Sequence, residues 1–185
     1  MRVGVLASGE GSNLQAILDR LHGGGDVRVV AVGSDQSHAR ALERARAAGV
    51  PARAFEQADR EARDAAMAAW LEDAGVELVV LAGYMRLLGT DFLARFPQRV
   101  INVHPALLPA FPGIGAVEQA IAYGVKVFGV TVHFVDEGVD SGPIIAQRAL
   151  APPDAADAAS IRAALRPLEH DLLCEAVQAI ARRSP

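Results

Sequence analysis

The sequence predicts an α/β fold with a doubly wound, mostly parallel sheet, in which buried strands alternate with amphipathic helices. Three observations lead to this prediction. Short apolar runs recur along the first hundred residues, and stretches with apolar residues at helical spacing separate them. Glycines follow several of these stretches, as is typical of helix ends. Strands joined through helices of this length form βαβ units with right-handed crossovers.

The expected strands are short and mostly apolar, and the first two have the character of strands buried on both faces of a sheet. They cover residues 3–7, 27–32, 51–55, 78–82 and 100–103. The expected helices between them cover residues 13–21, 39–48 and about 60–74. Asp59 is the expected N-cap of the third helix, because its carboxylate can accept a hydrogen bond from the first turn.

The pattern changes beyond Gly124. Residues 127–135 and 144–149 have the character of strands and are joined without a helix, so an antiparallel pair is expected near the C-terminal end. A helical tail follows over residues 160–183, and Pro167 is expected to start, kink or interrupt it. The sequence thus predicts a single α/β domain over residues 1–185, with a Rossmann-like doubly wound sheet.

The composition excludes several classes of protein. The chain has 185 residues, of which 51% are hydrophobic and 22% charged, and this balance is typical of a folded domain. One cysteine cannot form a disulfide framework, and a net charge of −4 argues against a broad nucleic-acid surface. No apolar run approaches the roughly 20 residues of a membrane helix. The N-terminus does not resemble a signal peptide, so we expect no membrane partner and a cytoplasmic location.

A glycine-rich loop follows the first expected strand and opens the first expected helix. Residues 8–13 read SGEGSN. Glycines let the backbone approach an oxyanion, and the N–H groups of a first helical turn favour negative charge. The loop therefore predicts a phosphate site on a mononucleotide-like ligand. Leu14 replaces the third glycine of a dinucleotide fingerprint. A plain glycine turn with a Ser or Asn helix cap is the alternative interpretation.

The end of the fifth expected strand carries an amide and an imidazole. Residues 101–105 read INVHP, so Asn102 and His104 point to the same face of the strand. An amide can stabilise a carbonyl oxygen that becomes an oxyanion, while an imidazole moves a proton. This pair suits acyl chemistry, although a histidine hydrogen-bonded for structural reasons is at least as common.

An acidic turn lies between the last two expected strands. Residues 136–143 read DEGVDSGP. An ordinary solvated hairpin loop is one interpretation. The other is that Asp140 reaches the His104 imidazole, orients the ring and favours its protonated form.

Taken together, these segments resemble the 10-formyltetrahydrofolate-dependent formyltransferase family. The resemblance rests on residues 8–15 (SGEGSNLQ), 82–88 (AGYMRLL), 102–109 (NVHPALLP), 129–135 (GVTVHFV) and 140–143 (DSGP), in this order. It extends over nearly the whole chain and implies the formyltransferase fold. The glycine-rich loop points to the members that use glycinamide ribonucleotide.

The resemblance also implies roles for individual residues. The implied catalytic residues are Asn102, His104 and Asp140. The residues implied for the ribonucleotide are Gly11, Ser12, Asn13 and Glu169. Those implied for the folate are Arg60, Met85, Arg86, Leu87, Leu88, Asn102, Asp136, Glu137, Gly138, Val139 and Asp140. His133 would support the site through a hydrogen bond. For Arg60 and Glu169 a solvated helix charge is the alternative.

The implied reaction transfers the formyl group of 10-formyltetrahydrofolate to the glycinamide amine of the ribonucleotide, in de novo purine synthesis. The expected partners are these small molecules, with no metal and no nucleic acid, in a monomer or a homodimer. The alternatives are a sugar-nucleotide N-formyltransferase, a formyltetrahydrofolate hydrolase and a non-catalytic nucleotide-binding module. A tRNA formyltransferase would need a further, usually basic, domain.

Overall fold

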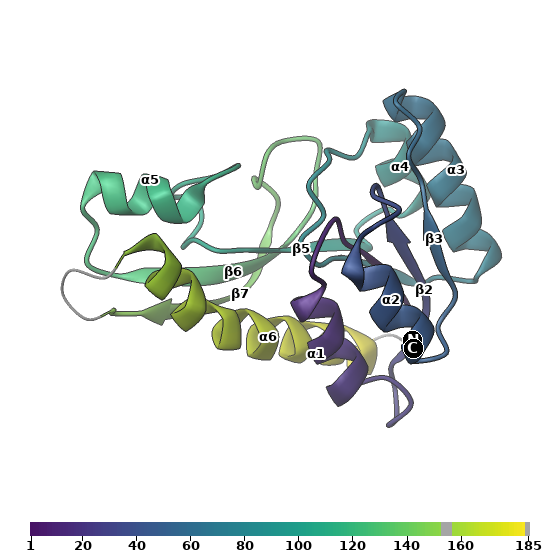
Figure 1. The fold of residues 1–185 in the computed structure, drawn as a ribbon, viewed down its shortest axis with the longest axis horizontal. Helices are drawn as coiled ribbons and strands as arrows, with labels where there is room; N and C mark the ends of the chain where they lie inside the picture. The colour runs from purple at the N-terminus through teal and green to yellow at the C-terminus, as the bar shows by residue number, and fades with distance from the viewer. Residues whose placement is uncertain (153–156, 184–185) are drawn as a thin grey trace.

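A seven-stranded sheet runs through the molecule in the order β3-β2-β1-β4-β5-β6-β7 (Figure 1). The computed structural model describes residues 1–152 and 157–183. The strands are β1 (Arg2–Leu6), β2 (Arg28–Ser34), β3 (Ala52–Ala54), β4 (Leu78–Leu81), β5 (Val100–His104), β6 (Phe128–Phe134) and β7 (Ile144–Leu150). The helices between and after them are α1 (Ser12–Arg20), α2 (Arg40–Ala47), α3 (Arg60–Asp73), α4 (Thr90–Arg95), α5 (Ala116–Tyr123) and α6 (Ala158–Arg183).

Two layers of helices cover the sheet because successive strand residues point to opposite faces. On β1, Val3 and Val5 join the core formed with α1, α2 and α6, whereas Leu6 joins the core formed with α3 and α4. Figure 1 shows α1, α2 and α6 in front of the sheet and α3 with α4 beside each other at one end. The central strand β1 is therefore apolar on both sides, as the sequence predicted.

The strand order reverses between β1 and β4, which pair in parallel. The chain winds outward from β1 through β2 to β3, then returns to β4 and winds the other way through β5. In open α/β sheets the loops at such a reversal separate, and ligands bind in the crevice beyond the carboxyl ends of the strands. Residues 8–13 and 82–89 follow β1 and β4 and lie at this position.

The predicted fold class is confirmed, with three differences in detail. β6 pairs antiparallel with β5 as well as with β7, so the antiparallel part of the sheet is larger than the one predicted pair. The short helices α4 and α5 were not predicted. The third difference concerns Pro167, for which the sequence left a start, a kink or an interruption of the helix open, and the structure excludes the start and the interruption.

Pro167 neither starts nor interrupts α6, which is helical from Ala158 to Arg183. A proline inside a helix removes one hydrogen bond and costs about 3 kcal/mol or more. Leu165 before it, and Leu172 and Leu173 after it, are all buried in one core. This burial on both sides of Pro167 outweighs the local cost and keeps the helix continuous. None of the helices in the described part of the chain, α6 included, combines the length and apolar character needed to cross a membrane.

We expect Gly142→Ala to destabilise the protein. Gly142 lies in the turn between β6 and β7, where a methyl group would overlap the backbone oxygen of Phe134. Relief of such an overlap requires a backbone shift, which typically costs about 1–3 kcal/mol. Urea denaturation should therefore show a lower midpoint. Gly24→Ala is the matched control, since nothing lies within 4 Å of its added methyl group. Equal midpoints for both variants would contradict the close packing of this turn.

Candidate active site

Asn102 and His104 project from β5 on the same face, because they lie two residues apart on a strand. The antiparallel register places His133 of β6 directly opposite Asn102. Side chains of directly opposed residues are neighbours on a sheet. His104 and His133 are both buried, and Asn102 is half-buried. Three polar side chains thus gather at the junction of β5 and β6.

The carboxylate of Asp140 contacts all three of these side chains. Its Oδ2 lies 3.3 Å from Nδ1 of His104 and accepts a 2.8 Å hydrogen bond from the backbone N–H of Gly113. Its Oδ1 accepts a 3.3 Å hydrogen bond from Nδ2 of Asn102 and lies 3.5 Å from Nε2 of His133. The structure therefore brings Asn102, His104 and Asp140 together, as expected, and adds His133 to the same cluster.

Hydrogen-bond chemistry assigns the protons of His104. Its Nε2 lies 2.8 Å from the backbone oxygen of Phe111. A carbonyl oxygen only accepts hydrogen bonds, so Nε2 carries a proton. The other nitrogen, Nδ1, faces the Asp140 carboxylate, and a protonated ring would donate to both partners. The surroundings of His104 thus accommodate the imidazolium form.

His133 has a similar arrangement with one difference. Its Nδ1 lies 2.8 Å from the Phe134 carbonyl oxygen and therefore carries a proton. Its Nε2 faces two groups, the Asn102 amide nitrogen at 3.3 Å and the Asp140 carboxylate at 3.5 Å. Neutral His133 accepts a hydrogen bond from Asn102 at Nε2, whereas protonated His133 donates one to Asp140. The proton on Nε2 thus determines which neighbour His133 engages.

The electrostatics of the cluster favour an ionised Asp140. A hydrogen bond from His133 is the largest cause that lowers the pKa of Asp140, which falls to about 2. Burial acts in the opposite direction, while the Gly113 N–H and the charges of His104 and His133 add to the lowering. The carboxylate is consequently negative throughout the neutral pH range and can stabilise positive charge on either imidazole.

Two residues of the cluster have unusual backbone conformations. Asp140 has φ = 51° and Phe111 has φ = 56°, both in the left-handed region that is uncommon for residues other than glycine. Asp140 supplies the carboxylate next to His104, and Phe111 supplies the carbonyl on the other side of the ring. Such strained conformations persist where the surrounding structure fixes them, and they occur frequently at functional sites.

The glycine-rich loop meets α1 at Gly11, which has φ = 71° and is the N-cap residue. A methyl group on Gly11 would lie 2.8 Å from the Cα of Ala41, so glycine is required for close packing as well. No side chain caps α1, so the Ser or Asn cap of the alternative interpretation is wrong. The first-turn N–H groups of α1 are the kind of donors that bind phosphate.

Asn13 and Glu169 meet beside this loop, although 156 residues separate them. Nδ2 of Asn13 donates a 3.2 Å hydrogen bond to Oε2 of Glu169. Burial is the main cause that raises the pKa of Glu169, against opposing effects of Asn13, Arg166 and His104. Oδ1 of Asn13 is buried and has no hydrogen-bond partner within the described residues. Unpaired buried acceptors are costly, so this atom is available to a donor on a ligand.

Residues 85–88, between β4 and α4, are fixed at both ends. The N–H of Met85 donates to Oγ of Ser8 at 2.8 Å. The buried pair Arg63–Asp64 of α3 holds the other end, because Arg63 donates to the Leu87 oxygen at 3.3 Å and Asp64 accepts from the Gly89 N–H at 2.7 Å. The side chains of Met85 and Leu87 are nonetheless 62% exposed. The backbone of this segment is thus held in place while apolar side chains remain exposed at its surface, where they could pack against a flat ring.

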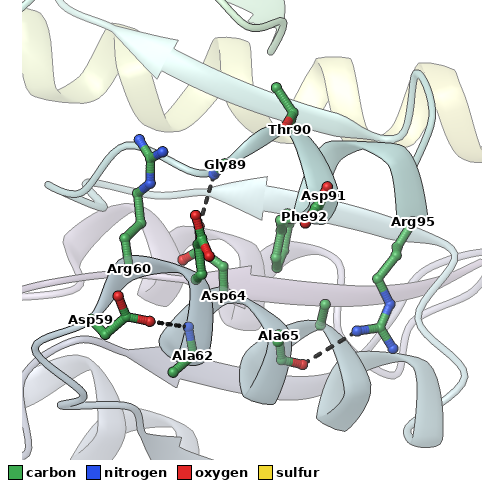
Figure 2. A pocket seen from close by; sticks show the side chains of 12 residues that line it. Asp59, Arg60, Ala62, Asp64, Ala65, Gly89, Thr90, Asp91, Phe92 and Arg95 are labelled. Atoms are coloured by element: carbon green, nitrogen blue, oxygen red, sulfur yellow. Dashed lines mark hydrogen bonds between the residues drawn. The ribbon is translucent and has the colours of Figure 1, made fainter.

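A cavity of about 560 Å³ lies between α3 and α4, at the end of this segment (Figure 2). Asp64 and Gly89 line it, and so does Arg60. Figure 2 shows the Arg60 side chain rising beside the Gly89 backbone. Asn102, His104 and Asp140 do not line the cavity. Arg60 is therefore next to the end of the segment 85–88 and apart from the histidine cluster.

The turn from Asp136 to Asp140 is braced by its first residue. The Asp136 carboxylate accepts hydrogen bonds from the Gly138 N–H at 3.1 Å and from the Ser141 hydroxyl at 2.8 Å. Glu137, Gly138 and Val139 are exposed, and Asp140 alone of the five turns inward to the cluster. Sequence reasoning did not anticipate the contacts of Phe111 and Gly113. Both act through backbone atoms, which leave no residue-type signal.

We expect His133→Gln to raise the pKa of Asp140 from about 2 toward its usual value near 3.8, because His133 is the largest cause of the lowering. The stability that ionised Asp140 provides is present above the unfolded-state value and lost as the pH falls toward about 2. In the variant the folded and unfolded pKa values lie closer together, so this pH-dependent contribution to stability should be smaller. Carbon-13 NMR of the Asp140 carboxyl carbon measures the titration.

His22→Gln is the matched control, because His22 contacts the N–H of Val29 instead of the cluster. An Asp140 titration that is the same in His133→Gln and in the unmodified protein would contradict the interaction between these two groups.

Comparison with known proteins agrees with this arrangement. Residues 1–177 match the family model described as formyl transferase. Phosphoribosylglycinamide formyltransferase of Mycobacterium tuberculosis is 48% identical over 183 residues, which are 97% of this chain and 85% of the relative. The Bacillus subtilis protein of the same name is 46% identical over 170 residues, with 90% and 87% covered.

Among solved structures, glycinamide ribonucleotide transformylase 1 from Symbiobacterium toebii superposes with a TM-score of 0.95 at 48% identity, covering 98% of this chain and 88% of that one. The family match spans nearly all the described strands and helices, including the segments that carry Asn102, His104 and Asp140. Its extent and these identities show that the chain belongs to the formyl transferase family.

Proposed function

We propose that this protein is a phosphoribosylglycinamide formyltransferase of de novo purine synthesis. It transfers the formyl group of 10-formyltetrahydrofolate to the amine of glycinamide ribonucleotide. The observation that carries the proposal is the joint contact of Asn102, His104 and Asp140 beside an open phosphate-type helix N-terminus. Relatives of whose length the match covers 85–87% bear this name at 46–48% identity.

The ribonucleotide binds at the end of α1 in this proposal. Gly11, Ser12 and the first-turn N–H groups hold its phosphate, since they form a helix N-terminus without a side-chain cap. Asn13 and Glu169 receive the glycinamide end. The half-buried carboxyl of Glu169 and the unpaired Oδ1 of Asn13 are acceptors for the N–H groups of that substrate.

The folate binds across the segment that follows β4 and the turn that follows β6. Met85, Arg86, Leu87 and Leu88 border its ring, and the backbone of this segment is already fixed on both sides. The turn residues Asp136, Glu137, Gly138, Val139 and Asp140 hold the pteridine. Arg60 stands at the cavity between α3 and α4, where its guanidinium can pair with the carboxylates of the folate tail.

The proposed reaction begins when the neutral amine attacks the formyl carbon. The carbonyl oxygen gains negative charge, which Asn102 and protonated His104 stabilise as hydrogen-bond donors. His104 does so by turning its Nε2–H from the Phe111 oxygen to the substrate oxygen, while its Nδ1–H stays on Asp140. The bond between the formyl carbon and N10 then breaks. The amine loses a proton and N10 gains one, with ionised Asp140 favouring the protonated imidazole throughout. Binding the two substrates side by side removes much of the entropic cost of their encounter.

The proposal treats residues 1–185 as a single formyltransferase domain in the cytoplasm, as a monomer or homodimer with no metal cofactor. Its partners are small molecules. His133 supports Asn102 and Asp140 and does not touch the reacting atoms.

Incubation with glycinamide ribonucleotide and 10-formyltetrahydrofolate tests the function. We expect formylglycinamide ribonucleotide and tetrahydrofolate to appear in equal amounts, as measured by mass spectrometry and by absorbance of the folate. Omission of the ribonucleotide should stop folate turnover. Release of formate without the ribonucleotide would instead identify a hydrolase, and binding of the ribonucleotide without turnover would identify a non-catalytic module.

Asn102→Ala should lower kcat about a hundred- to a thousandfold, the usual loss for one oxyanion donor. The affinity for the ribonucleotide should change little, because this donor acts on the transition state. Steady-state kinetics and calorimetry give the two values. Gln178→Ala is the control, since it removes a half-buried amide elsewhere, near the end of α6. Near-normal turnover in Asn102→Ala would overturn its assignment as the oxyanion donor.

A further inference from the structure

Three loops converge where the strand order reverses. Ser8 follows β1, Asp35 follows β2, and residues 83–86 follow β4. Parallel strands end at the same edge of a sheet, so these loops meet there. The first loop leads into the phosphate-type end of α1, and the third leads into the segment assigned to folate.

Ser8 joins the first loop to the third through two hydrogen bonds. Its backbone N–H donates to the Gly83 oxygen at 3.0 Å, and its hydroxyl oxygen accepts from the Met85 N–H at 2.8 Å. The hydroxyl interaction depends on the side chain, so an alanine at this position would lose it. Ser8 therefore fixes the backbone where the segment begins.

Asp35 holds the next residue of that segment. Its Oδ2 accepts a 3.0 Å hydrogen bond from Nε of Arg86 and another from the Gln36 amide. The side chain of Asp35 is 4% exposed, whereas that of Arg86 is 56% exposed. Burial tends to raise the pKa of Asp35, but the Ser8 hydroxyl, the Gln36 amide and Arg86 together keep it below its usual value. Its Oδ1 is buried and has no hydrogen-bond partner in the described part of the chain.

A buried carboxylate paired with an exposed arginine adds little to stability, because the loss of hydration offsets the attraction. Its position at the reversal of strand order indicates a different role. We propose that Ser8 and Asp35 are positioning residues, which set the place of residues 83–86 relative to the glycine-rich loop and thereby the affinity for the folate. The identity of the ligand rests on the function proposed above.

Without the Ser8 and Asp35 side chains, the glycine-rich loop would keep more of its hydrogen bonds than the segment after β4. The glycine-rich loop has anchors of its own: Glu10 bonds to Arg40 and Arg44 of α2, and the Ala41 N–H donates to the Gly9 oxygen. In the segment after β4, the Arg63–Asp64 pair holds the far end and the Tyr84 side chain is buried in the core, whereas the Met85 N–H and the Arg86 side chain are held by Ser8 and Asp35. Loss of Ser8 or Asp35 should therefore loosen residues 85 and 86 on the folate side and leave the ribonucleotide side in place.

The experiment measures both affinities by calorimetry in Asp35→Ala and Ser8→Ala. The probe for the folate side is 5-formyltetrahydrofolate, whose formyl group is not positioned for transfer, and the other probe is glycinamide ribonucleotide. We expect each variant to bind the folate about tenfold more weakly, equivalent to about 1.4 kcal/mol. Ribonucleotide affinity should stay within about twofold. In kinetics, KM for 10-formyltetrahydrofolate should rise more than kcat falls.

Asp35→Asn should recover part of the folate affinity, because its amide oxygen can still accept from Arg86. Asp35→Asn also retains the shape of the side chain. If Asp35→Ala does not fold, Asp35→Asn and Ser8→Ala can be measured in its place. Glu175→Ala is the matched control, since it removes a carboxylate bonded to Arg148 of β7, at the antiparallel edge of the sheet, and should change neither affinity.

Unchanged folate affinity in the folded variants, or equal losses for both ligands, would overturn the positioning role. Failure of the unmodified protein to bind either probe would instead overturn the proposed function, so the two failures are distinguishable.

Discussion

The Asp140 carboxylate is the interaction on which the rest of the site depends. It connects β5, β6, the loop after β5 and the turn in which it lies, through His104, Asn102, His133 and the Gly113 N–H. A buried carboxylate needs such compensation, because loss of hydration alone would favour its neutral form. Here the compensating groups are also the groups proposed for catalysis. The arrangement that keeps Asp140 ionised therefore also orients Asn102 and both imidazoles.

The scaffold around this cluster is rigid where a ligand would need precise positioning. Residues 85–88 are held from α3 on one side and from the loop after β1 on the other. The strained backbones of Phe111 and Asp140 are stabilised by the hydrogen bonds that their own groups make. A site held in this way loses little conformational entropy when a ligand binds, which favours affinity and correct orientation.

Much of the fold followed from local pattern, since strands buried on both faces and glycines at helix ends leave clear signals. What could not be predicted depended on packing at a distance. Pro167 lies within a continuous helix because buried leucines on both sides outweigh its local cost. β6 pairs with β5 as well as β7, and that register alone places His133 opposite Asn102. The Asp140 side chain points toward the cluster because its backbone is in the left-handed region, and the presence of an aspartate in a sequence does not predict that conformation. The residue roles came from family resemblance and are still proposals.

The candidate site draws on segments far apart in the chain, as the contact between Asn13 of α1 and Glu169 of α6 shows. No contiguous part of the sequence contains these groups together, so the complete site exists only in the fully folded molecule. A ligand that spans it binds the native state and not the unfolded chain. The free energy of unfolding then rises with the logarithm of the free ligand concentration once that concentration exceeds Kd, by mass action. A larger metabolic supply of substrate would in this way lower the unfolded fraction and lengthen the survival of the protein against proteolysis.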